Sequence, residues 1–243
     1  MTTAPPLAFA WRPRRIVVTG GTGFVGRAVC DTLVTRYPGV QLVVPTRHLV
    51  TARSIQTLPG VEPIEADIHD PRQAAALLDG ADALVQLVAI LHGSDSALER
   101  VHVQLQKTLA HAAQAAGVRR VVQVSALGVS ADAPSAYLRR KAGGEAVWQR
   151  SGLAVALLRP SVIFGVDDHF TNLFARLQHV FPLLPLAGAD ARFQPVWVGD
   201  VAAAVAATLA RPPGDDPVLE CAGPEVLTLR QIVQAVGAMA GCA

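Results

Sequence analysis

The sequence predicts an α/β protein, a doubly wound parallel sheet with a small C-terminal lobe, and three observations lead to this fold class. Apolar strand patterns alternate with helical patterns through most of residues 14–165. The connections between them are short. A glycine-rich turn joins the first strand pattern to the first helical one. Such an alternation favours parallel strands with helices packed on both faces of the sheet.

Each expected strand is a short apolar run, and each expected helix repeats its apolar residues every three or four positions. The expected strands are residues 16–19, 41–46, 61–68, 81–91, 118–127 and 153–165. The expected helices are residues 24–35, 70–80, 98–116, 136–151, 199–210 and 228–240. Gly117 is expected to end the third of these helices, and Asp200 is expected to be the N-cap of the fifth.

The glycine-rich turn lies in residues 16–26, IVVTGGTGFVG, where a β-branched run stops at Gly20, Gly23 and Gly26. Glycine accepts positive φ and lets the backbone approach a ligand closely. The turn precedes an expected helix, whose free N–H groups and dipole attract an anion. The spacing is a variant of the dinucleotide-binding fingerprint. The alternative is a plain strand-to-helix corner rich in glycine.

Composition excludes several classes of function. The chain has 243 residues, is 51% hydrophobic and carries a net charge of +2 without a long Lys/Arg run, so we expect a packed protein and no nucleic-acid partner. Cys30, Cys221 and Cys242 are far apart and lack metal-ligand spacing, so we expect no metal and a reducing, cytoplasmic compartment. No apolar stretch approaches the roughly 18 residues of a transmembrane helix. Contact with a membrane complex stays open.

Tyr137 and Lys141 stand four residues apart in an expected helix and therefore share one face. An ammonium beside a phenol favours the phenolate, so we expect the pKa of Tyr137 to be lowered and its side chain to act as an acid or base. With 2 Tyr in the chain, a chance pair at this spacing is disfavoured. Ser125 ends an apolar strand, where parallel sheets bind ligands, and is a candidate to hold a substrate oxygen. The alternatives are an exposed helix pair and a serine that bonds its own turn.

Arg47 ends the second expected strand, where an NAD-selective protein usually carries Asp or Glu. A guanidinium there favours a ribose 2′-phosphate through a charge-assisted bond. We therefore expect NADP(H) as cofactor, with NAD(H) as the second choice. A solvated Arg47 is the alternative.

Seven segments in combination resemble the short-chain dehydrogenase/reductase superfamily in its extended or atypical branch: TGGTGFVG, EADIHD, LVAILHG, SALGV, YLRRK, LRPSVIFG and PVWVGDVA. More narrowly, the chain is similar to the group, often described as NAD-dependent epimerase/dehydratase, that contains the NADPH-binding accessory subunit of respiratory complex I and its bacterial homologues. The resemblance covers residues 14–235. It departs from the usual pattern at LVAILHG and at His102, where many relatives keep an Asn in a proton relay.

The resemblance implies a role for each matching residue. Those expected around the pyrophosphate are Gly20, Thr22, Gly23, Phe24, Val25 and Gly26. Those expected around the adenosine are Asp67, Ile68, Val88, Ala89 and Ile90. Ser125, Tyr137 and Lys141 match the catalytic residues, and Tyr137 and Lys141 also contact the cofactor. Those expected beside the nicotinamide are Arg159, Pro160, Ser161 and Val162.

From these observations we expect a flexible N-terminal segment (1–13), a Rossmann-type dinucleotide-binding domain (14–165) and a substrate-side lobe (166–243) that ends as if truncated. Two functions stay open. One is an oxidoreductase or epimerase acting on an unknown small molecule. The other is a non-catalytic nucleotide-binding subunit or assembly factor of a respiratory or quinone-related system, peripheral to the inner membrane. The apolar run 170–186 is expected to form an apolar pocket, a docking surface or part of the ordinary hydrophobic core.

Overall fold

The computed structural model describes residues 11–181, 184–212, 214 and 216–241, and its centre is a sheet of seven strands. The strand order is β10-β6-β5-β4-β1-β2-β3, and every neighbouring pair is parallel. The strands are β1 (Arg15–Thr19), β2 (Gln41–Thr46), β3 (Val61–Glu65), β4 (Ala83–Gln86), β5 (Arg120–Val124), β6 (Val155–Pro160) and β10 (Val218–Cys221). The predicted doubly wound parallel sheet is confirmed, and its order reverses between β1 and β4.

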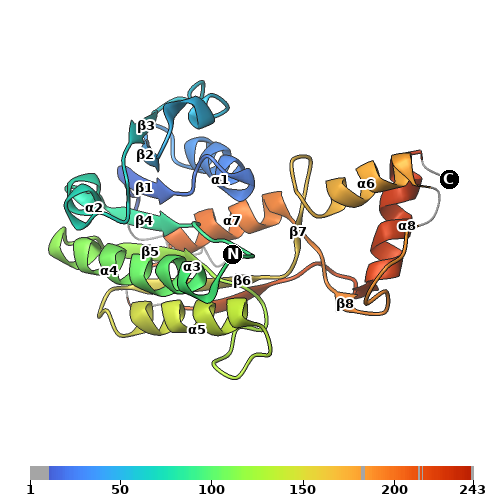
Figure 1. The fold of residues 1–243 in the computed structure, drawn as a ribbon. Coiled ribbons are helices and arrows are strands. Elements are labelled where there is room, and N and C mark those ends of the chain that lie inside the picture. Colours follow the sequence, from blue (N-terminus) through green and yellow to red (C-terminus); the bar gives the residue numbers. More distant parts are fainter. Residues whose placement is uncertain (1–10, 182–183, 213, 215, 242–243) are drawn as a thin grey trace, which may run out of the picture.

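Helices cover both faces of the sheet (Figure 1). Alternate residues of β1 point to opposite faces, so Ile16 and Val18 pack with α1 (Phe24–Arg36) and α7 (Val198–Leu209). Val17 lies in the core of the other face, together with α2 (Pro71–Leu78), α4 (Leu105–Ala115) and α5 (Ala136–Gln149). Because side chains on both faces of the sheet are covered by helices, the central strands β1, β2 and β4 are mostly apolar at successive positions.

The helix expected over residues 98–116 is interrupted. It consists of α3 (Asp95–Glu99), a π-helical turn η2 (Arg100–Gln104) and α4. The Gln106 side chain donates to the Val101 carbonyl oxygen over 3.0 Å. A π turn accommodates one extra residue and leaves carbonyl groups free for other partners. Gly144 of α5 packs against this turn, and a Cβ on it would lie 2.2 Å from the His102 carbonyl oxygen.

The C-terminal part of the chain divides between the main body and a lobe. After β7 (Ile163–Phe164), the lobe holds α6 (Thr171–Val180), β8 (Arg192–Phe193), β9 (Val196–Trp197), β11 (Leu227–Thr228) and α8 (Leu229–Met239). The α6–α8 pair extends away from the sheet (Figure 1), and the Gln178 side chain joins it by donating to the Val233 carbonyl over 3.1 Å. In contrast, α7 and β10 follow residue 165 yet complete the main body.

Two further expectations can be compared with the structure. The N-cap of α7 is Trp197, and Asp200 lies in the first turn of the helix without capping it, so the N-cap expected at Asp200 is wrong. Its carboxylate still lies near the positive end of the helix dipole. Residues 1–10 of the expected flexible segment, and residues 242–243 at the chain end, lie outside the described residues, whereas Trp11 packs against the core.

Candidate functional site

The glycine-rich turn joins β1 to α1 at the carboxyl edge of the sheet. Gly20 has a φ of 77°, and the Gly23 N–H donates to its carbonyl over 3.0 Å. A Cβ on Gly26 would lie 2.2 Å from the Gly20 carbonyl oxygen, so only glycine permits this packing. Helix α1 has no side-chain cap and no acidic residue in its first turn. Its first N–H groups are therefore available to an anion.

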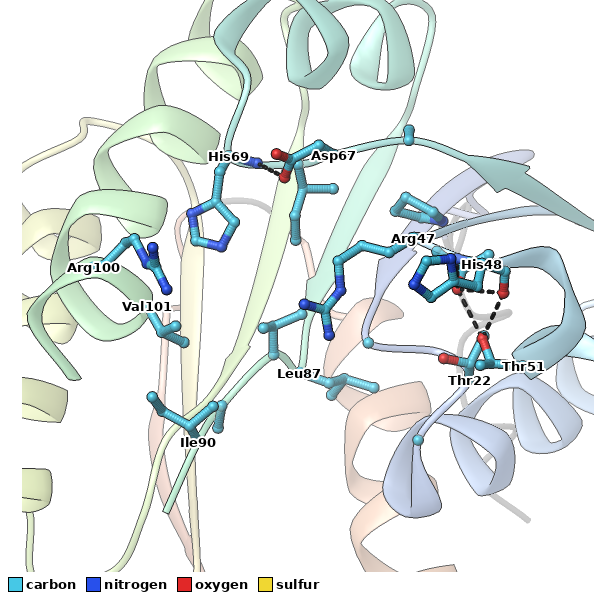
Figure 2. Close-up of a pocket in the computed structure, with 18 residues that line it drawn as sticks. Thr22, Arg47, His48, Thr51, Asp67, His69, Leu87, Ile90, Arg100 and Val101 are labelled. Carbon is cyan, nitrogen blue, oxygen red and sulfur yellow. Dashed lines mark hydrogen bonds between the residues drawn. The ribbon is translucent and has the colours of Figure 1, made fainter. Parts of the chain in front are cut away.

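A first cavity of about 620 Å³ opens above this turn (Figure 2). It lies over the ends of β1, β2, β3 and β4, at the point where the strand order reverses. It brings together half of the residues expected to bind the dinucleotide: Gly20, Thr22, Gly23, Arg47, Asp67, Ile68, Val88, Ala89 and Ile90. Phe24, Val25 and Gly26 do not line it; they belong to the first turn of α1 behind it.

Basic side chains gather in the first cavity. Arg47 and Arg100 line it from different elements and reach toward its interior, as does His69 (Figure 2). The described residues offer neither arginine an ion-pair partner. The Asp67 carboxylate also lines the cavity and accepts the His69 backbone N–H over 2.9 Å. Two arginines thus face one carboxylate, and the lining carries an excess of positive charge. Sequence reasoning missed Arg100, which only the π turn brings to the cavity.

A second cavity of about 580 Å³ lies beside the first, between the carboxyl ends of β5 and β6 and the C-terminal lobe. The two cavities share one loop, since Ile90 lines the first and Leu91 the second. The second is lined mainly by apolar side chains, together with Tyr137, Ser161, Arg192 and Gln194. Pro160 and Val162 also line it. The apolar run 170–186 does not contribute; as far as described it forms α6, none of whose residues is fully buried.

Tyr137 is half-buried in the wall of the second cavity, and Lys141 is fully buried one turn further along α5. The ammonium of Lys141 donates to the Val124 carbonyl oxygen on β5 over 2.9 Å. Burial lowers the pKa of Lys141 to about 8 and raises the pKa of Tyr137 to about 12. The expectation that Lys141 lowers the phenol pKa is therefore wrong, because desolvation of the phenolate dominates. Tyr137 is a neutral hydrogen-bond donor at pH 7.

Ser125 directly follows β5 and Val124, the residue whose carbonyl accepts from Lys141. The side chain is buried, and Oγ has no hydrogen-bond partner among the described residues. The alternative in which Ser125 bonds its own turn is therefore not observed. A buried hydroxyl without a partner costs about 1–3 kcal/mol, so a polar atom supplied by a ligand would stabilise this part of the structure.

His102 contacts one residue from the wall of each cavity, Ile90 of the first and Tyr137 of the second, although it lines neither. On the π turn, its Nε2 lies 2.9 Å from the Ile90 carbonyl oxygen, and its ring meets that of Tyr137 edge-on at 5.3 Å. Burial lowers the pKa of His102, so the imidazole is neutral near pH 7. Nε2–H is then the donor to Ile90, which orients the ring against Tyr137.

Arg159 does not face the cavities with its side chain. Its guanidinium binds the Glu145 carboxylate of α5 in a bidentate pair of 3.0 and 2.6 Å. Leu157, two residues earlier on β6, also belongs to the core of the α4–α5 face, and the period of two along a strand sends Arg159 to the same face. Among residues 159–162, the cavity wall is formed by Pro160, Ser161 and Val162.

Replacing Lys141 by Met is expected to raise the melting temperature at pH 7, by ~2–4 °C for each kcal/mol gained. The folded-state pKa of about 8 lies below the ordinary 10.5, so below pH 8 folding buries a charge at full cost. Between these pH values the unfolded state holds more protons, and stability rises with pH. The gain in the variant should therefore shrink from pH 7 to pH 10.5.

The measurement is thermal unfolding of the parent and the variant across this pH range. Lys107→Met is the matched control, because Lys107 is exposed on α4. A Lys141→Met protein less stable than the parent at pH 7, or a difference independent of pH, would contradict the assigned protonation.

Taken together, a parallel sheet, a glycine turn at a helix start and a cavity at the reversal of strand order define a Rossmann-type nucleotide-binding protein. The chain belongs to the NAD(P)H-binding family, which it matches over residues 20–212. Within the described residues, no helix is long and apolar enough to cross a membrane, and no group of His, Cys, Asp or Glu could hold a metal ion.

Similar proteins confirm the predicted resemblance to extended short-chain dehydrogenase/reductases and to a complex I subunit. Subunit 9 of the mitochondrial NADH dehydrogenase [ubiquinone] 1 alpha subcomplex of Arabidopsis thaliana is 30% identical, over 89% of this chain and 56% of that protein. An NAD(P)H azoreductase of Xenophilus azovorans is 26% identical, over 93% of this chain and 74% of that protein. The crystal structure of dTDP-glucose 4,6-dehydratase from Streptomyces venezuelae with NAD and TYD superposes with a TM-score of 0.82 at 26% identity, covering 93% and 81% of the two chains.

The complex I relatives are longer than this chain. The chain spans 56% to 60% of the length of the Arabidopsis and Dictyostelium discoideum proteins.

Proposed function

We propose that the protein is an NADP(H)-dependent oxidoreductase that reduces a ketone, with Tyr137 as the proton donor. The observation that carries this proposal is the position of a neutral, half-buried phenol in the wall of the second cavity, next to the cavity of the cofactor. The residues of the first cavity fit a dinucleotide: free N–H groups at the start of α1 suit the pyrophosphate, and Arg47 with Arg100 suits a 2′-phosphate.

Each polar group near Tyr137 then has a defined task. Ser125 donates its free hydroxyl to the ketone oxygen and so satisfies a group that the protein leaves unpaired. Lys141, charged below pH about 8, binds the cofactor ribose and adds positive charge near the oxygen that becomes negative. Val88, Ala89 and Ile90 pack against the adenosine side.

The reaction adds two hydrogens across one double bond. A reduced dinucleotide, when bound, supplies a hydride to the carbonyl carbon and is left oxidised. The Tyr137 hydroxyl gives its proton to the carbonyl oxygen, so the C=O π bond breaks as one C–H and one O–H bond form. A phenol with a pKa of about 12 is protonated throughout the neutral range, which suits reduction better than oxidation.

Replacing Arg47 by Ala is expected to weaken NADP(H) binding by roughly tenfold to a hundredfold, the value of a charge-assisted contact, and to leave NAD(H) binding nearly unchanged. Only NADP(H) carries the 2′-phosphate that the guanidinium would bind. Calorimetric titration of both cofactors at moderate salt measures this. Arg53→Ala is the matched control, because Arg53 is exposed nearby, after η1 (Leu49–Ala52), and does not line the cavity. Tighter NAD(H) binding that is indifferent to Arg47 would overturn the choice of NADP(H).

A second candidate is a non-catalytic nucleotide-binding subunit or assembly factor of a respiratory or quinone-related system. The similarity to complex I subunits favours it, and it would place a cytoplasmic protein at the periphery of the inner membrane. The bound dinucleotide would then stabilise the fold by mass action. Mass spectrometry of small molecules that copurify with the protein, followed by NADPH oxidation against ketones, quinones and nucleotide sugars, separates the candidates. Binding without turnover across this panel would favour the subunit.

A further inference from the structure

The second cavity has an uneven distribution of charge. Among the residues that the structure describes, its wall contains no acidic side chain and one charged side chain, Arg192 of β8. The described residues give Arg192 no ion-pair partner. The nearest acidic residue along the chain, Asp190, instead lies 3.8 Å from Arg230. A guanidinium is thus left free at the edge of an apolar cavity.

The remaining polar groups of this cavity are few. Gln194 donates its amide hydrogen to the Gly223 carbonyl over 2.7 Å, and the Ser161 backbone N–H is bonded to the Cys221 carbonyl over 2.9 Å. Most other lining side chains are aliphatic or aromatic, among them Leu127, Leu138 and Phe193. Such a surface cannot satisfy the many hydroxyl groups of a sugar, which would remain unpaired when buried.

Tyr137 and Arg192 reach the cavity from different parts of the molecule. Tyr137 lies in the first turn of α5, in the main body, and Arg192 lies in the lobe on β8, which pairs with β11. In Figure 1, α5 lies below the sheet of the main body and β8 lies in the lobe, to the right. A single ligand that contacts both would therefore meet Tyr137 from the main body and Arg192 from the lobe.

We propose that the substrate of the second cavity is an amphipathic ketone: an apolar body, a carbonyl at Tyr137 and one anionic group, a carboxylate or a phosphate monoester, bound by Arg192. This rests on the proposed function for the identity of the reacting carbonyl. The cavity volume of about 580 Å³ is in the range of sites for small organic ligands, about 300–1,000 Å³. A guanidinium binds either anion with two parallel hydrogen bonds, while the apolar wall contributes affinity through buried area.

Equilibrium binding tests the proposal separately from turnover. The probes are 11-oxododecanoate, its methyl ester and 11-oxododecyl phosphate, each below its micelle concentration and measured by calorimetry on the complete protein. We expect the parent to bind both anions tenfold or more tightly than the ester, with an affinity that falls as salt is added. The difference in affinity between the oxo acid and the oxo phosphate shows which anion the cavity prefers.

The variants are Arg192→Gln, which keeps much of the length without the charge, and Arg192→Lys, which restores the charge. Arg192→Gln should lose the preference for anions and bind the ester as the parent does, and Arg192→Lys should recover part of it. Arg230→Gln, on the same lobe but outside the cavity, should change nothing. Equal affinity of the parent for acid and ester, or an unchanged preference in Arg192→Gln, would overturn the proposal. So would tighter binding of uridine diphosphate than of the oxo acid.

The binding result and the proposed function fail in different ways. If the anions bind through Arg192 but NADPH is not oxidised in their presence, the anion site stands and the reductase assignment falls. If NADPH reduces the methyl ester as efficiently as the acid, the reductase assignment stands and the role of Arg192 falls.

Discussion

Replacing Tyr137 by Phe is expected to slow the chemical step by roughly 10²- to 10⁴-fold while dinucleotide affinity changes little. The substitution removes the proton donor but keeps the ring, including its edge-on contact with His102 at 5.3 Å. The variant should fold, because the described residues give the phenol oxygen no hydrogen bond to lose. The variant would then keep its affinity for the dinucleotide and lose most of the rate of the chemical step.

The assay is single-turnover loss of NADPH absorbance in the near ultraviolet with a responsive ketone. Tyr37→Phe is a matched control, since Tyr37 donates its hydroxyl to the Ala206 carbonyl over 2.7 Å, far from the cavities; it should lose stability and keep the rate. With a Tyr137 pKa of about 12, the parent's proton donor should stay protonated up to at least pH ~10. A Tyr137→Phe protein that reduces the ketone at the parent's rate would remove Tyr137 from the mechanism.

Replacing Gly26 by Ala is expected to lower the free energy of unfolding by about 3 kcal/mol or more and to abolish dinucleotide binding. Its Cβ would lie 2.2 Å from the Gly20 carbonyl oxygen and 2.5 Å from the Gly21 Cα. Both are backbone atoms of the turn, so relief requires the turn itself to move. The stability of the fold and the shape of the anion site would therefore be lost together.

Gly23→Ala is the informative partner of this variant. At Gly23 the nearest atom to a new Cβ is the Gly20 carbonyl oxygen, at 3.3 Å, and the backbone there is extended, with φ −78°. The protein should stay close to the parent in stability, but the methyl group would crowd the cavity wall and weaken dinucleotide binding. Denaturant unfolding and calorimetry on both variants measure this. Parental stability in Gly26→Ala would mean that the turn is looser than the structure has it.

Much of the fold and of the first cavity follows from local signals in the sequence. The β-branched run of β1, the glycines at 20, 23 and 26 and the following helical pattern lie within a few residues of one another. The ends of the strands can also be predicted from the sequence, and parallel strands bring their carboxyl ends to one edge of the sheet. The position of Arg47 at a strand end therefore predicted its place at the cavity, and the resemblance to a known family implied Asp67 and Val88.

Protonation of the catalytic candidates was not predictable in the same way. Spacing alone put Lys141 beside Tyr137, but both pKa values depend on burial, and burial comes from the π turn, α4 and β6 packing around α5. Desolvation opposes charge on both groups, so the phenol is neutral where the sequence predicted a lowered pKa. The Arg159 side chain was similarly unpredictable, because its partner Glu145 is brought to it only when α5 packs on β6.

What the sequence by itself determined is the order of elements, the parallel sheet and the anion-binding turn, since each depends on periodicity and backbone sterics over short spans. The tertiary structure decided the π turn that brings Arg100 to the first cavity and His102 against Tyr137, the return of α7 and β10 to the main body, and the second cavity with its free Arg192. These features depend on contacts between residues far apart in the chain, whose energies are set by desolvation and packing rather than by local propensity.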